Sequence, residues 1–559
     1  DFRFQGQARF QPADKGHGGT LAFPMDGGHL EVLAASGQAS ADIGTASLRA
    51  VDVNAVGAAR LSLGSLPVVR YGQGGNLLDF STGGAAGAIT VRDGASLSAA
   101  EVLLIANSTV ANQGAGIKVE QGAAISTLGR GKSAFDAEDG FVYQPGYRGV
   151  LAVSNGRLQM LAPEYDSVGA PASIRIGTCA QAACAGATSL YSEGSIAFAT
   201  SSAFELGDAV RYGTRHLTLA VGGINVGSAQ ALDAAAARGA LPPGLTLNQE
   251  VLDRLLRGDA STGAPALQTL SLTAAQSLNF YGDATLSTMD ASGKSLLDKL
   301  SLTTPAMYGG GKAGEAARIV TDTLVWNGGT AGPAALPGAV LAGGAGTGSG
   351  TLDVNARRIE FGYGPDTRPD TLADAQRLIL GFADVRLNAS ERITANHKGS
   401  LAVHQSQGAY AAGKGYAYAG GDLYLNTPLL TGQAGSVNRI TAGGALYIAG
   451  AGAGLGGPAA LAGSDALGAE LLLAGNSVTL DTAVVLPSGK LTLAATGDVR
   501  LLDGAQLDMA GRKVSIHDAD KYSWGGEVIL TSRSGNIAQA AAAGIDVSAR
   551  NNQGGKVQA

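Results

Sequence analysis

The stretch GKLTLAATGDVRLLDGAQLDMAGRKVSI, residues 489–516, decides the fold. Apolar residues alternate with small or polar ones in four short units, built on Leu491 and Leu493, Val499 and Leu501, Leu507 and Met509, and Val514 and Ile516. Strict alternation is typical of a strand with one buried face. The units follow one another too closely for a sandwich, in which turn signals come every ~8–12 residues. The pattern therefore predicts short strands that stack by coiling.

The same pattern recurs along most of the chain. Examples are AITVRDGASLSAAEVLLIANS (88–108), GTLDVNARRIEFGYG (350–364) and GALYIAG (444–450). Gly, Asn or Asp separates almost every pair of units and supplies the positive φ that sharp corners need. With about three strands in a coil of roughly 20 residues, this spacing predicts an all-β fold of the parallel β-helix type. Stacked coils would lie ~4.8 Å apart, with small apolar residues filling a narrow core.

Composition favours the same architecture. The chain has 559 residues, more than one compact core usually holds, since domains tend to split beyond ~250–300 residues. Gly contributes 85 residues and Pro only 17, which argues against a disordered or collagen-like chain. Charged residues make up 15%, below the usual ~25%. Such a chain suits a solenoid that grows in one dimension, with each repeat touching only its neighbours.

Charge and hydropathy exclude several classes of partner. The formal net charge is −6 and the pI is about 5.6, without long runs of either sign. A basic footprint for nucleic acid is missing, and no apolar stretch approaches the ~18 residues of a membrane span. We therefore expect no nucleic acid partner and no membrane span. DFRFQGQARF (1–10) lacks a signal-peptide pattern and GGKVQA (554–559) resembles the start of another strand, so we expect a piece of a longer chain.

The two cysteines, Cys179 and Cys184, lie in GTCAQAACAGA (177–187). A pair this close in a loop-like context suits a small structural disulfide in an exported protein. Reduced bystanders and redox or metal chemistry are the alternatives. Histidines are scattered rather than clustered, so we expect no metal and no cofactor. They are His17, His29, His216, His397, His404 and His517.

One stretch, SAQALDAAAARGALPPGLTLNQEVLDRLLRGD (228–259), breaks the alternation. It is Ala-rich, and five apolar side chains recur at helical spacing. They are Leu247, Val251, Leu252, Leu255 and Leu256. We expect Asn248 to cap a helix that ends near Arg257, with Gly258 just beyond it.

These patterns predict three segments. Coils of a β-helix are expected over residues 1–227 and again over 261–559, with a helical insertion over 228–260 between them. Glycine-rich excursions from the second set of coils are expected at 327–350 and 451–470.

Four stretches resemble the C-terminal region of the large exoproteins of the filamentous haemagglutinin family, which are secreted through the outer membrane by the two-partner route. They are GINVGSAQALDAAAARGALPPGLTLNQEVLDRLLRGD (223–259), LILGFADVRLNASERITAN (378–396), GGDLYLNTPLLTGQAGSVNRITAGGALYIAG (420–450) and GIDVSARNNQGGKVQ (544–558). The resemblance extends over most of residues 85–559. The family's N-terminal secretion domain with its NPNL-type motif is not found here, and no toxin module is recognised at the end.

The resemblance implies a right-handed parallel β-helix that is secreted by, or displayed on the surface of, a Gram-negative bacterium. It implies a structural rod of a filamentous adhesin, which mediates attachment or aggregation by binding a host or bacterial surface glycan or protein. The parent chain's partners would include an outer-membrane secretion pore. Because both ends of the sequence read as mid-pattern, we expect either continuation into further coils or self-association along the rod axis. The alternatives are a β-helix polysaccharide lyase or hydrolase and the stalk of a toxin-delivery exoprotein.

Two groups of residues are candidates for ligand binding. Arg257, Gly258 and Asp259 spell RGD, a tripeptide that integrins recognise in exposed loops and that some family members carry. The helical pattern favours Gly258 as the end of a helix instead. Tyrosines could serve as platforms for sugar rings, with packing over loops as the competing interpretation. They are Tyr143, Tyr147, Tyr410, Tyr416 and Tyr418.

Charged clusters were weighed as catalytic sites because β-helix polysaccharide enzymes need carboxylates, often with Arg or Lys, on one outer wall. The clusters are Asp136 with Glu138 and Asp139, Asp518 with Asp520, and Arg357 with Arg358 and Glu360. None recurs at the spacing of one coil as an opposed acid and base. The sequence therefore predicts solvated loops and a protein that is not an enzyme.

Overall fold

The structure is a computed structural model. It describes residues 8–10, 18–72, 75–107, 116–164, 172–179, 184, 186–329, 340–362, 374–450, 465–517 and 519–559. Contacts between residues divide the chain into two units. Unit 1 comprises Asp1–Ile224, Pro243–Leu245 and Asp253–Ala275, and unit 2 comprises Asn225–Pro242, Thr246–Leu252 and Gln276–Ala559.

Unit 1 contains three main sheets. The first has the order β17 (Phe204–Leu206), β14 (Ser173–Thr178), β10 (Gly116–Glu120), β7 (Ala88–Val91), β2 (His29–Leu33), β3 (Thr45–Arg49), and the second has the order β18 (Val210–Gly213), β15 (Thr188–Tyr191), β11 (Ala124–Ser126), β8 (Ser96–Ser98). The third joins β1 (Thr20–Pro24), β4 (Arg60–Gly64), β9 (Glu101–Ala106), β13 (Gly149–Ser154), β16 (Ser195–Thr200) and the start of β19 (His216–Gly227). Neighbours in the first two sheets are parallel.

One strand of unit 1 runs against the predicted parallel pattern. β13 is antiparallel to both β9 and β16. The reversal follows an excursion, because after β11 the chain passes through β12 (Phe141–Gln144), which pairs with β6 (Gly75–Asp79) beside β5 (Val68–Gly72). The chain returns from this side sheet in the opposite direction, and β13 lies between β9 and β16.

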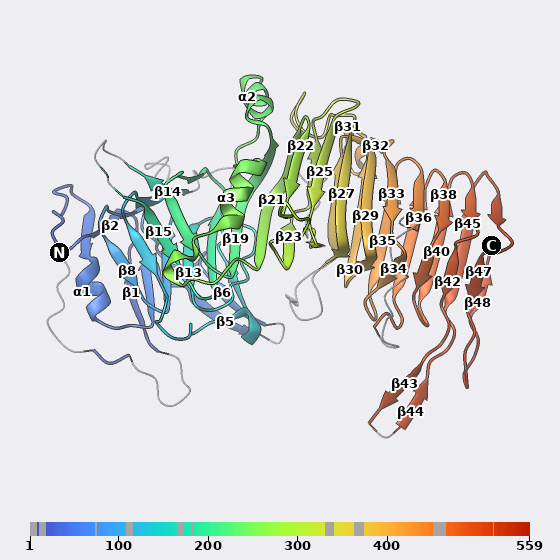
Figure 1. The fold of residues 1–559 in the computed structure, drawn as a ribbon, viewed down its shortest axis with the longest axis horizontal. Helices are drawn as coiled ribbons and strands as arrows, with labels where there is room; N and C mark the ends of the chain where they lie inside the picture. Colours follow the sequence, from blue (N-terminus) through green and yellow to red (C-terminus); the bar gives the residue numbers. More distant parts are fainter. Residues whose placement is uncertain are drawn as a thin grey trace. The chain divides into compact units, whose positions relative to one another are not determined.

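Unit 2 is built from three parallel ladders. The first ladder begins at the end of β21 (Thr269–Tyr281). Its later strands are, in order, β24 (Ala306–Gly309), β28 (Ala375–Leu380), β30 (Lys398–His404), β35 (Val437–Ala442), β37 (Glu470–Gly475), β40 (Lys490–Ala495), β45 (Glu527–Ser532) and β48 (Lys556–Gln558). These strands succeed one another along the unit in Figure 1.

The second and third ladders share two long strands, β27 (Gly350–Phe361) and β29 (Phe382–Ala395). The second ladder also contains β22 (Ala284–Ser287), β25 (Ala316–Val320), β33 (Asp422–Asn426), β36 (Leu446–Ala449), β38 (Val478–Asp481), β41 (Val499–Leu501) and β46 (Ile537–Gln539). The third contains β23 (Lys299–Thr303), β26 (Thr323–Trp326), β34 (Leu429–Gly432), β39 (Ala483–Val485), β42 (Gln506–Asp508) and β47 (Gly544–Asp546).

The register explains the alternation in residues 489–516. Leu491 pairs with Leu471 and Leu493 with Leu473, one repeat of about 20 residues earlier. Leu491, Leu493, Val499, Leu501, Leu507 and Met509 are all buried. The predicted all-β fold with parallel sheets is confirmed in this respect, and the topology is consistent with a β-helix or another solenoid.

The last alternating unit of that stretch does not belong to a ladder, so this part of the prediction was wrong. Val514 and Ile516 lie in β43 (Lys513–Ile516), which pairs antiparallel with β44 (Ala519–Tyr522). The two strands form a hairpin that extends away from the ladders in Figure 1. A second hairpin, β31 (Ser406–Ala411) with β32 (Gly415–Ala419), interrupts the chain between β30 and β33.

Helices occur where the alternation breaks. α2 (Ala229–Ala237) begins after Ser228, and α3 (Gln249–Arg257) begins after Asn248, whose side chain accepts a hydrogen bond from the N–H of Val251 at 2.9 Å. Gly258 follows α3 with φ +53°, a conformation that favours glycine. The remaining short elements are α1 (Ala50–Ala55), β20 (Leu245–Leu247) and the 3₁₀ turns η2 (Ala137–Asp139) and η3 (Ala260–Thr262). Among the described residues, no helix has the length and apolar character needed to cross a membrane.

The predicted glycine-rich excursions are described only in part. Residues 330–339 and 451–464, which make up much of 327–350 and 451–470, lie outside the described residues. Beyond them the chain re-enters the ladders at β27 and β37.

Candidate functional site

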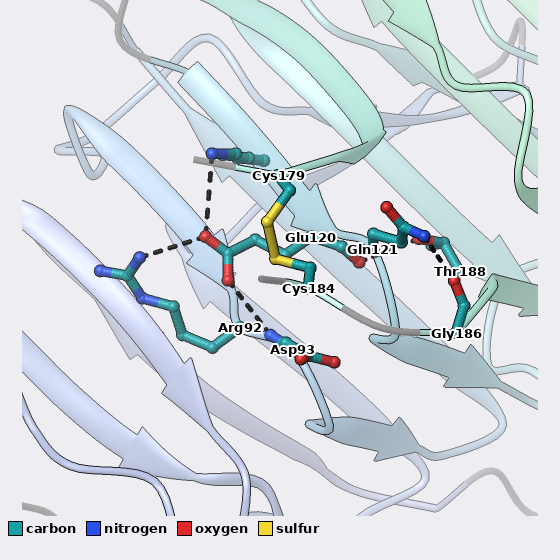
Figure 2. The surroundings of a disulfide bond; sticks show 9 residues. Arg92, Asp93, Glu120, Gln121, Cys179, Cys184, Gly186 and Thr188 are labelled. Atoms are coloured by element: carbon teal, nitrogen blue, oxygen red, sulfur yellow. Dashed lines mark hydrogen bonds and ion pairs between the residues drawn. A yellow bond between two sulfur atoms is a disulfide. The ribbon is translucent and has the colours of Figure 1, made fainter. Parts of the chain in front are cut away.

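Cys179 and Cys184 are joined by a disulfide bond in unit 1. Figure 2 shows it beside Glu120, at the end of β10. The Glu120 carboxylate accepts a hydrogen bond from the Arg92 guanidinium at 3.2 Å and another from the N–H of Asp93 at 3.2 Å. Both cysteines of the chain are used in the bond, so this arrangement has no thiol for redox or metal chemistry.

Charged side chains on the first sheet of unit 1 form a row next to the disulfide. Arg92 also donates from Nε to Glu31 at 3.2 Å, so that it links Glu31 to Glu120 across neighbouring strands. Burial raises the pKa of Glu31, but hydrogen bonds from Ser40, Ser47 and Arg92 outweigh burial and lower the pKa overall. The row is a set of mutually satisfied ion pairs and has a structural role.

Tyr143 cannot bind an external ligand, which corrects the prediction made for it. Its side chain is fully buried, and its ring stacks on Phe80 with centroids 5.7 Å apart. Its hydroxyl donates to the Glu101 carboxylate at 3.0 Å. Burial, and then the charge of Glu101, raises the pKa of Tyr143 well above its ordinary value. Tyr147, the other candidate from this excursion, is 46% exposed.

The other three predicted tyrosines are brought together in unit 2 by the hairpin β31–β32. Tyr410 and Tyr416 face each other as a cross-strand pair, with ring centroids 5.2 Å apart in an edge-to-face arrangement. Tyr416 and Tyr418 follow with centroids 6.4 Å apart. We call Tyr410, Tyr416 and Tyr418 the tyrosine cluster.

The tyrosine cluster is anchored at one end and open at the other. Tyr418 stacks on His404 of β30 with centroids 4.9 Å apart and packs against a buried apolar cluster. Burial raises the pKa of Tyr418. Tyr410 is 50% exposed. The hairpin thus presents an aromatic edge whose base is fixed to the ladder, which is the arrangement needed for stacking on a ligand.

The RGD tripeptide lies at the end of a helix rather than at the tip of an exposed loop. Arg257 is the last residue of α3 and is exposed. The Asp259 carboxylate is already occupied, because it accepts hydrogen bonds from the Tyr191 hydroxyl at 2.6 Å and the N–H of Ser261 at 2.9 Å. Hydrogen bonds from Ser261 and Tyr191 lower the pKa of Asp259 to about 2. This geometry supports helix termination over integrin recognition.

Asp136 and Asp520, from two of the charged clusters considered as catalytic sites, are engaged in local structure. Asp136 caps η2 by accepting from the N–H of Glu138 at 2.8 Å, and it also accepts from the N–H of Arg157 at 3.1 Å. Asp520 pairs with Lys513 at 2.7 Å across β43 and β44. Asp518 lies outside the described residues. These contacts hold turns and hairpins in place.

Arg357 and Arg358 belong to an ion-pair network on unit 2. Arg357 binds Asp322 at 2.8 Å and also contacts Glu391, while Arg358 binds Glu391 at 2.7 Å. Hydrogen bonds from the arginines lower the pKa values of Asp322 and Glu391. Glu360 lies further along the same strand, β27. The carboxylates of the network are ionised and paired, so none is poised to donate a proton at neutral pH.

The described histidines do not converge. His29 and His216 belong to unit 1, whereas His397, His404 and His517 belong to unit 2; His17 lies outside the described residues. In the part of the chain that the structure describes, no group of three or more His, Cys, Asp or Glu side chains could hold a metal ion.

His216 is expected to make the stability of unit 1 depend on pH. Its ring forms a 2.7 Å hydrogen bond with the Thr269 hydroxyl. Burial, followed by the charges of Arg157 and Arg215, lowers the pKa of His216 to about 4. Because the folded pKa lies below the ordinary value near 6.5, the folded state prefers the neutral ring. Stability should be complete above about pH 6.5 and should fall by on the order of 3 kcal/mol as the pH drops to about 4.

Urea unfolding of the wild type and of His216→Gln between pH 7 and pH 4 measures this dependence. The glutamine keeps a hydrogen-bonding group but does not titrate, so its unfolding free energy should fall less steeply. His517→Asn, at an exposed position, is the matched control and should behave as the wild type does. Equal slopes for His216→Gln and the wild type would contradict the assignment.

Trp524 was not among the residues identified from the sequence. It is 62% exposed and lines a hollow of about 660 Å³ with Glu470, Lys490 and Lys556. The local sequence YSWGGE (522–527) does contain a signal, since a tryptophan beside two glycines departs from the alternating pattern. The hollow could not be found from the sequence because Glu470, Lys490 and Lys556 lie 54, 34 and 32 residues from Trp524.

Comparisons with protein-family models, with curated proteins and with solved structures found no match to this chain. The resemblance to filamentous haemagglutinins therefore stays a prediction from the sequence.

Proposed function

We propose that the chain is a segment of a secreted or cell-surface adhesin of the filamentous haemagglutinin type. In this proposal its strands form a right-handed parallel β-helix that serves as a scaffold and binds a surface glycan or protein. The parent chain would leave a Gram-negative cell through an outer-membrane pore by the two-partner route. The three parallel ladders of unit 2 support the architecture, and the family resemblance supplies the location and the route.

The tyrosine cluster is the observation that carries the binding function. The hairpin β31–β32 is an addition to the ladders, because β30 and β33 could be joined by a short turn. An isolated two-stranded hairpin is marginally stable in water. Its base is held by the contact of Tyr418 with His404, and it presents Tyr410 to solvent. Exposed aromatic side chains on a rigid base are typical of recognition surfaces.

We propose binding rather than catalysis. Among the described carboxylates, Asp136 accepts hydrogen bonds from two backbone donors and Glu391 pairs with two arginines. A scaffold of stacked ladders with projecting hairpins provides surface area and spacing, which adhesion requires. Polysaccharide cleavage would require a free acid and base facing one groove.

Replacing Tyr410 and Tyr416 should remove binding without unfolding the protein. The wild type is assayed on an array of glycans and matrix proteins, and each spot is re-assayed afterwards to test whether the ligand is intact. Tyr410→Ser with Tyr416→Ser should weaken binding to the recognised spots by about 10-fold or more. Ligand should remain intact on those spots.

Tyr447→Ser is the matched control, because Tyr447 stacks on Tyr424 on the flat second ladder with centroids 4.9 Å apart. It should bind as the wild type does, and the melting temperature of the hairpin variant should be unchanged. Loss of ligand on the array would replace the adhesin proposal with an enzyme. No binding to any spot would also overturn it.

A further inference from the structure

Two neighbouring hollows lie on the outer face of the first ladder of unit 2. One, of about 330 Å³, reaches from Gln376 on β28 to Thr492 on β40, and the other, of about 660 Å³, extends to Lys556 on β48. Both hollows are lined by Glu470 and Lys490, so they adjoin each other at these two side chains. We call the combined feature the long groove. It crosses strands β28, β30, β35, β37, β40, β45 and β48, a span of about 29 Å at the spacing of strands in a sheet.

The floor of the long groove is regular because the strands are in register. Gln376, Ser400 and Arg439 follow one another on successive strands, and Leu472 and Thr492 continue the same row. The backbone groups of these strands are used in the parallel ladder. Over these strands a ligand meets side chains, whereas β48, at the end of the groove, pairs only with β45 among the described strands.

Glycines deepen the groove at one end. A Cβ on Gly526 would lie 2.3 Å from the carbonyl oxygen of Gly489, and a Cβ on Gly555 would lie 1.8 Å from the carbonyl oxygen of Gly526. Only glycine permits this close stacking of backbones. As a consequence, no side chains fill the space beside Trp524, and a hollow remains there.

Trp524 borders this hollow with an exposed side chain on a hydrogen-bonded backbone. Its carbonyl oxygen accepts a hydrogen bond from the Ser488 hydroxyl at 2.6 Å, and the next residue, Gly525, donates to the carbonyl of Gln553 at 2.9 Å. The chain around the indole is thereby fixed, while the side chain itself is 62% exposed. An exposed indole on a backbone held in this way offers an apolar face for stacking.

The charges in this part of the groove balance one another. Glu527 lies between Lys490 at 3.5 Å and Lys556 at 2.8 Å, and hydrogen bonding to Lys556 contributes to a lowered pKa of Glu527. Glu470 neighbours Lys490 on the other side. The lining thus has alternating signs and no dominant charge. A polyanion such as nucleic acid gains no net attraction from it.

We propose that the long groove binds an extended polysaccharide chain of uncharged sugars, with one ring stacked on Trp524. Length, side-chain hydrogen-bonding groups along the floor and an aromatic platform at one end match a linear chain of hydroxyl-bearing rings. An extended peptide gains most of its affinity from a free strand edge, and the first-ladder strands from β28 to β45 are each paired on both sides. The inference deepens the proposed function, on which it rests, by adding a second site and naming its ligand chemistry.

The tryptophans of the chain give a direct readout. There are two, and the other one, Trp326, is 2% exposed and donates its indole N–H to the carbonyl of Thr304 at 2.9 Å. Ligand-induced changes in tryptophan fluorescence therefore report on Trp524. The probes are β-linked hexasaccharides of glucose, mannose and N-acetylglucosamine, with the corresponding monosaccharides and a 12-residue Gly/Ser/Pro peptide.

At least one hexasaccharide should change the fluorescence and bind at least about 10-fold more tightly than its monosaccharide, because it occupies more of the groove. Trp524→Ala should weaken its binding, measured by calorimetry, by about 10-fold or more. Thr492→Arg, which places a bulky side chain on the floor, should do the same. Thr479→Arg is the matched control on the outer face of the second ladder and should bind as the wild type does.

Unchanged hexasaccharide binding in both Trp524→Ala and Thr492→Arg would overturn the inference, as would binding of the peptide in place of the sugars or no binding of any hexasaccharide. The two proposals can fail separately. Suppose that the tyrosine variant loses binding to array spots that Trp524→Ala still binds, and that no hexasaccharide binds. The adhesin proposal then stands and the groove proposal falls. If hexasaccharides bind and depend on Trp524 while the tyrosine variant binds every array spot normally, the tyrosine cluster is wrongly assigned.

Discussion

Glu101→Ala is expected to lower the unfolding free energy of unit 1 by about 3–5 kcal/mol, the usual cost of breaking a buried ion pair by removing one partner. Glu101 is fully buried and pairs with Arg60, which is 3% exposed. Its second oxygen accepts hydrogen bonds from Ser133 at 2.7 Å, Ser154 at 2.9 Å and Tyr143 at 3.0 Å. The alanine variant leaves a buried guanidinium uncompensated and three hydroxyls without their acceptor.

Urea unfolding, followed by circular dichroism, measures the effect, with Glu138→Ala as the control because Glu138 is an exposed acid of the same excursion. The control should change the unfolding free energy by less than about 0.5 kcal/mol. Arg60→Met combined with Glu101→Leu should recover part of the loss, since no unpaired charge remains. The hydroxyls stay unsatisfied, so recovery should be incomplete. A loss below 1 kcal/mol for Glu101→Ala would show that the network does not hold the excursion in place.

Leu493→Ala is expected to destabilise unit 2 by about 2–5 kcal/mol, because deleting a buried leucine loses its transfer free energy and leaves a cavity. Leu493 is fully buried and lies in register between Leu473 and Leu530 on the first ladder. The neighbouring coils are fixed by their own ladder bonds, so they have little freedom to close the space.

The measurement is the urea midpoint together with hydrogen exchange of the amides of β37, β40 and β45. Protection should fall in these three strands more than in distant ones, because each repeat contacts its neighbours. Thr492→Ala, one residue away and facing outward, is the control and should leave the midpoint nearly unchanged. Equal effects of the two variants would contradict the assignment of Leu493 to the core.

The ladders of unit 2 could be predicted because their signal is local. The alternation of Leu491 and Leu493, and of Val499 and Leu501, records which face of each strand is buried, and the repeat length records where the next strand begins. The start of α3 was equally readable, since Asn248 and Gly258 act within one turn of the helix.

The features that escaped prediction depend on distant residues. Tyr143 resembles an exposed aromatic in its local sequence, but its ring is buried against Phe80 and its hydroxyl donates a hydrogen bond to Glu101, 42 residues earlier. The alternation of Val514 and Ile516 has the pattern of a ladder strand, yet β43 pairs only with its hairpin partner in the described chain. Trp524 becomes a candidate only when Lys490 and Lys556 are placed beside it.

The alternating charges along the first ladder restrict how the chain can change in length. Glu470, Lys490 and Glu527 follow one another on β37, β40 and β45, and Lys556 comes next on β48. Duplicating the single repeat that begins at Glu470 would set two glutamates on adjacent strands, about 4.8 Å apart, where like charges repel. Duplicating two successive repeats restores the alternation. In this part of the molecule, gain or loss of an even number of repeats is therefore favoured over an odd number, because only an even number keeps opposite charges on adjacent strands.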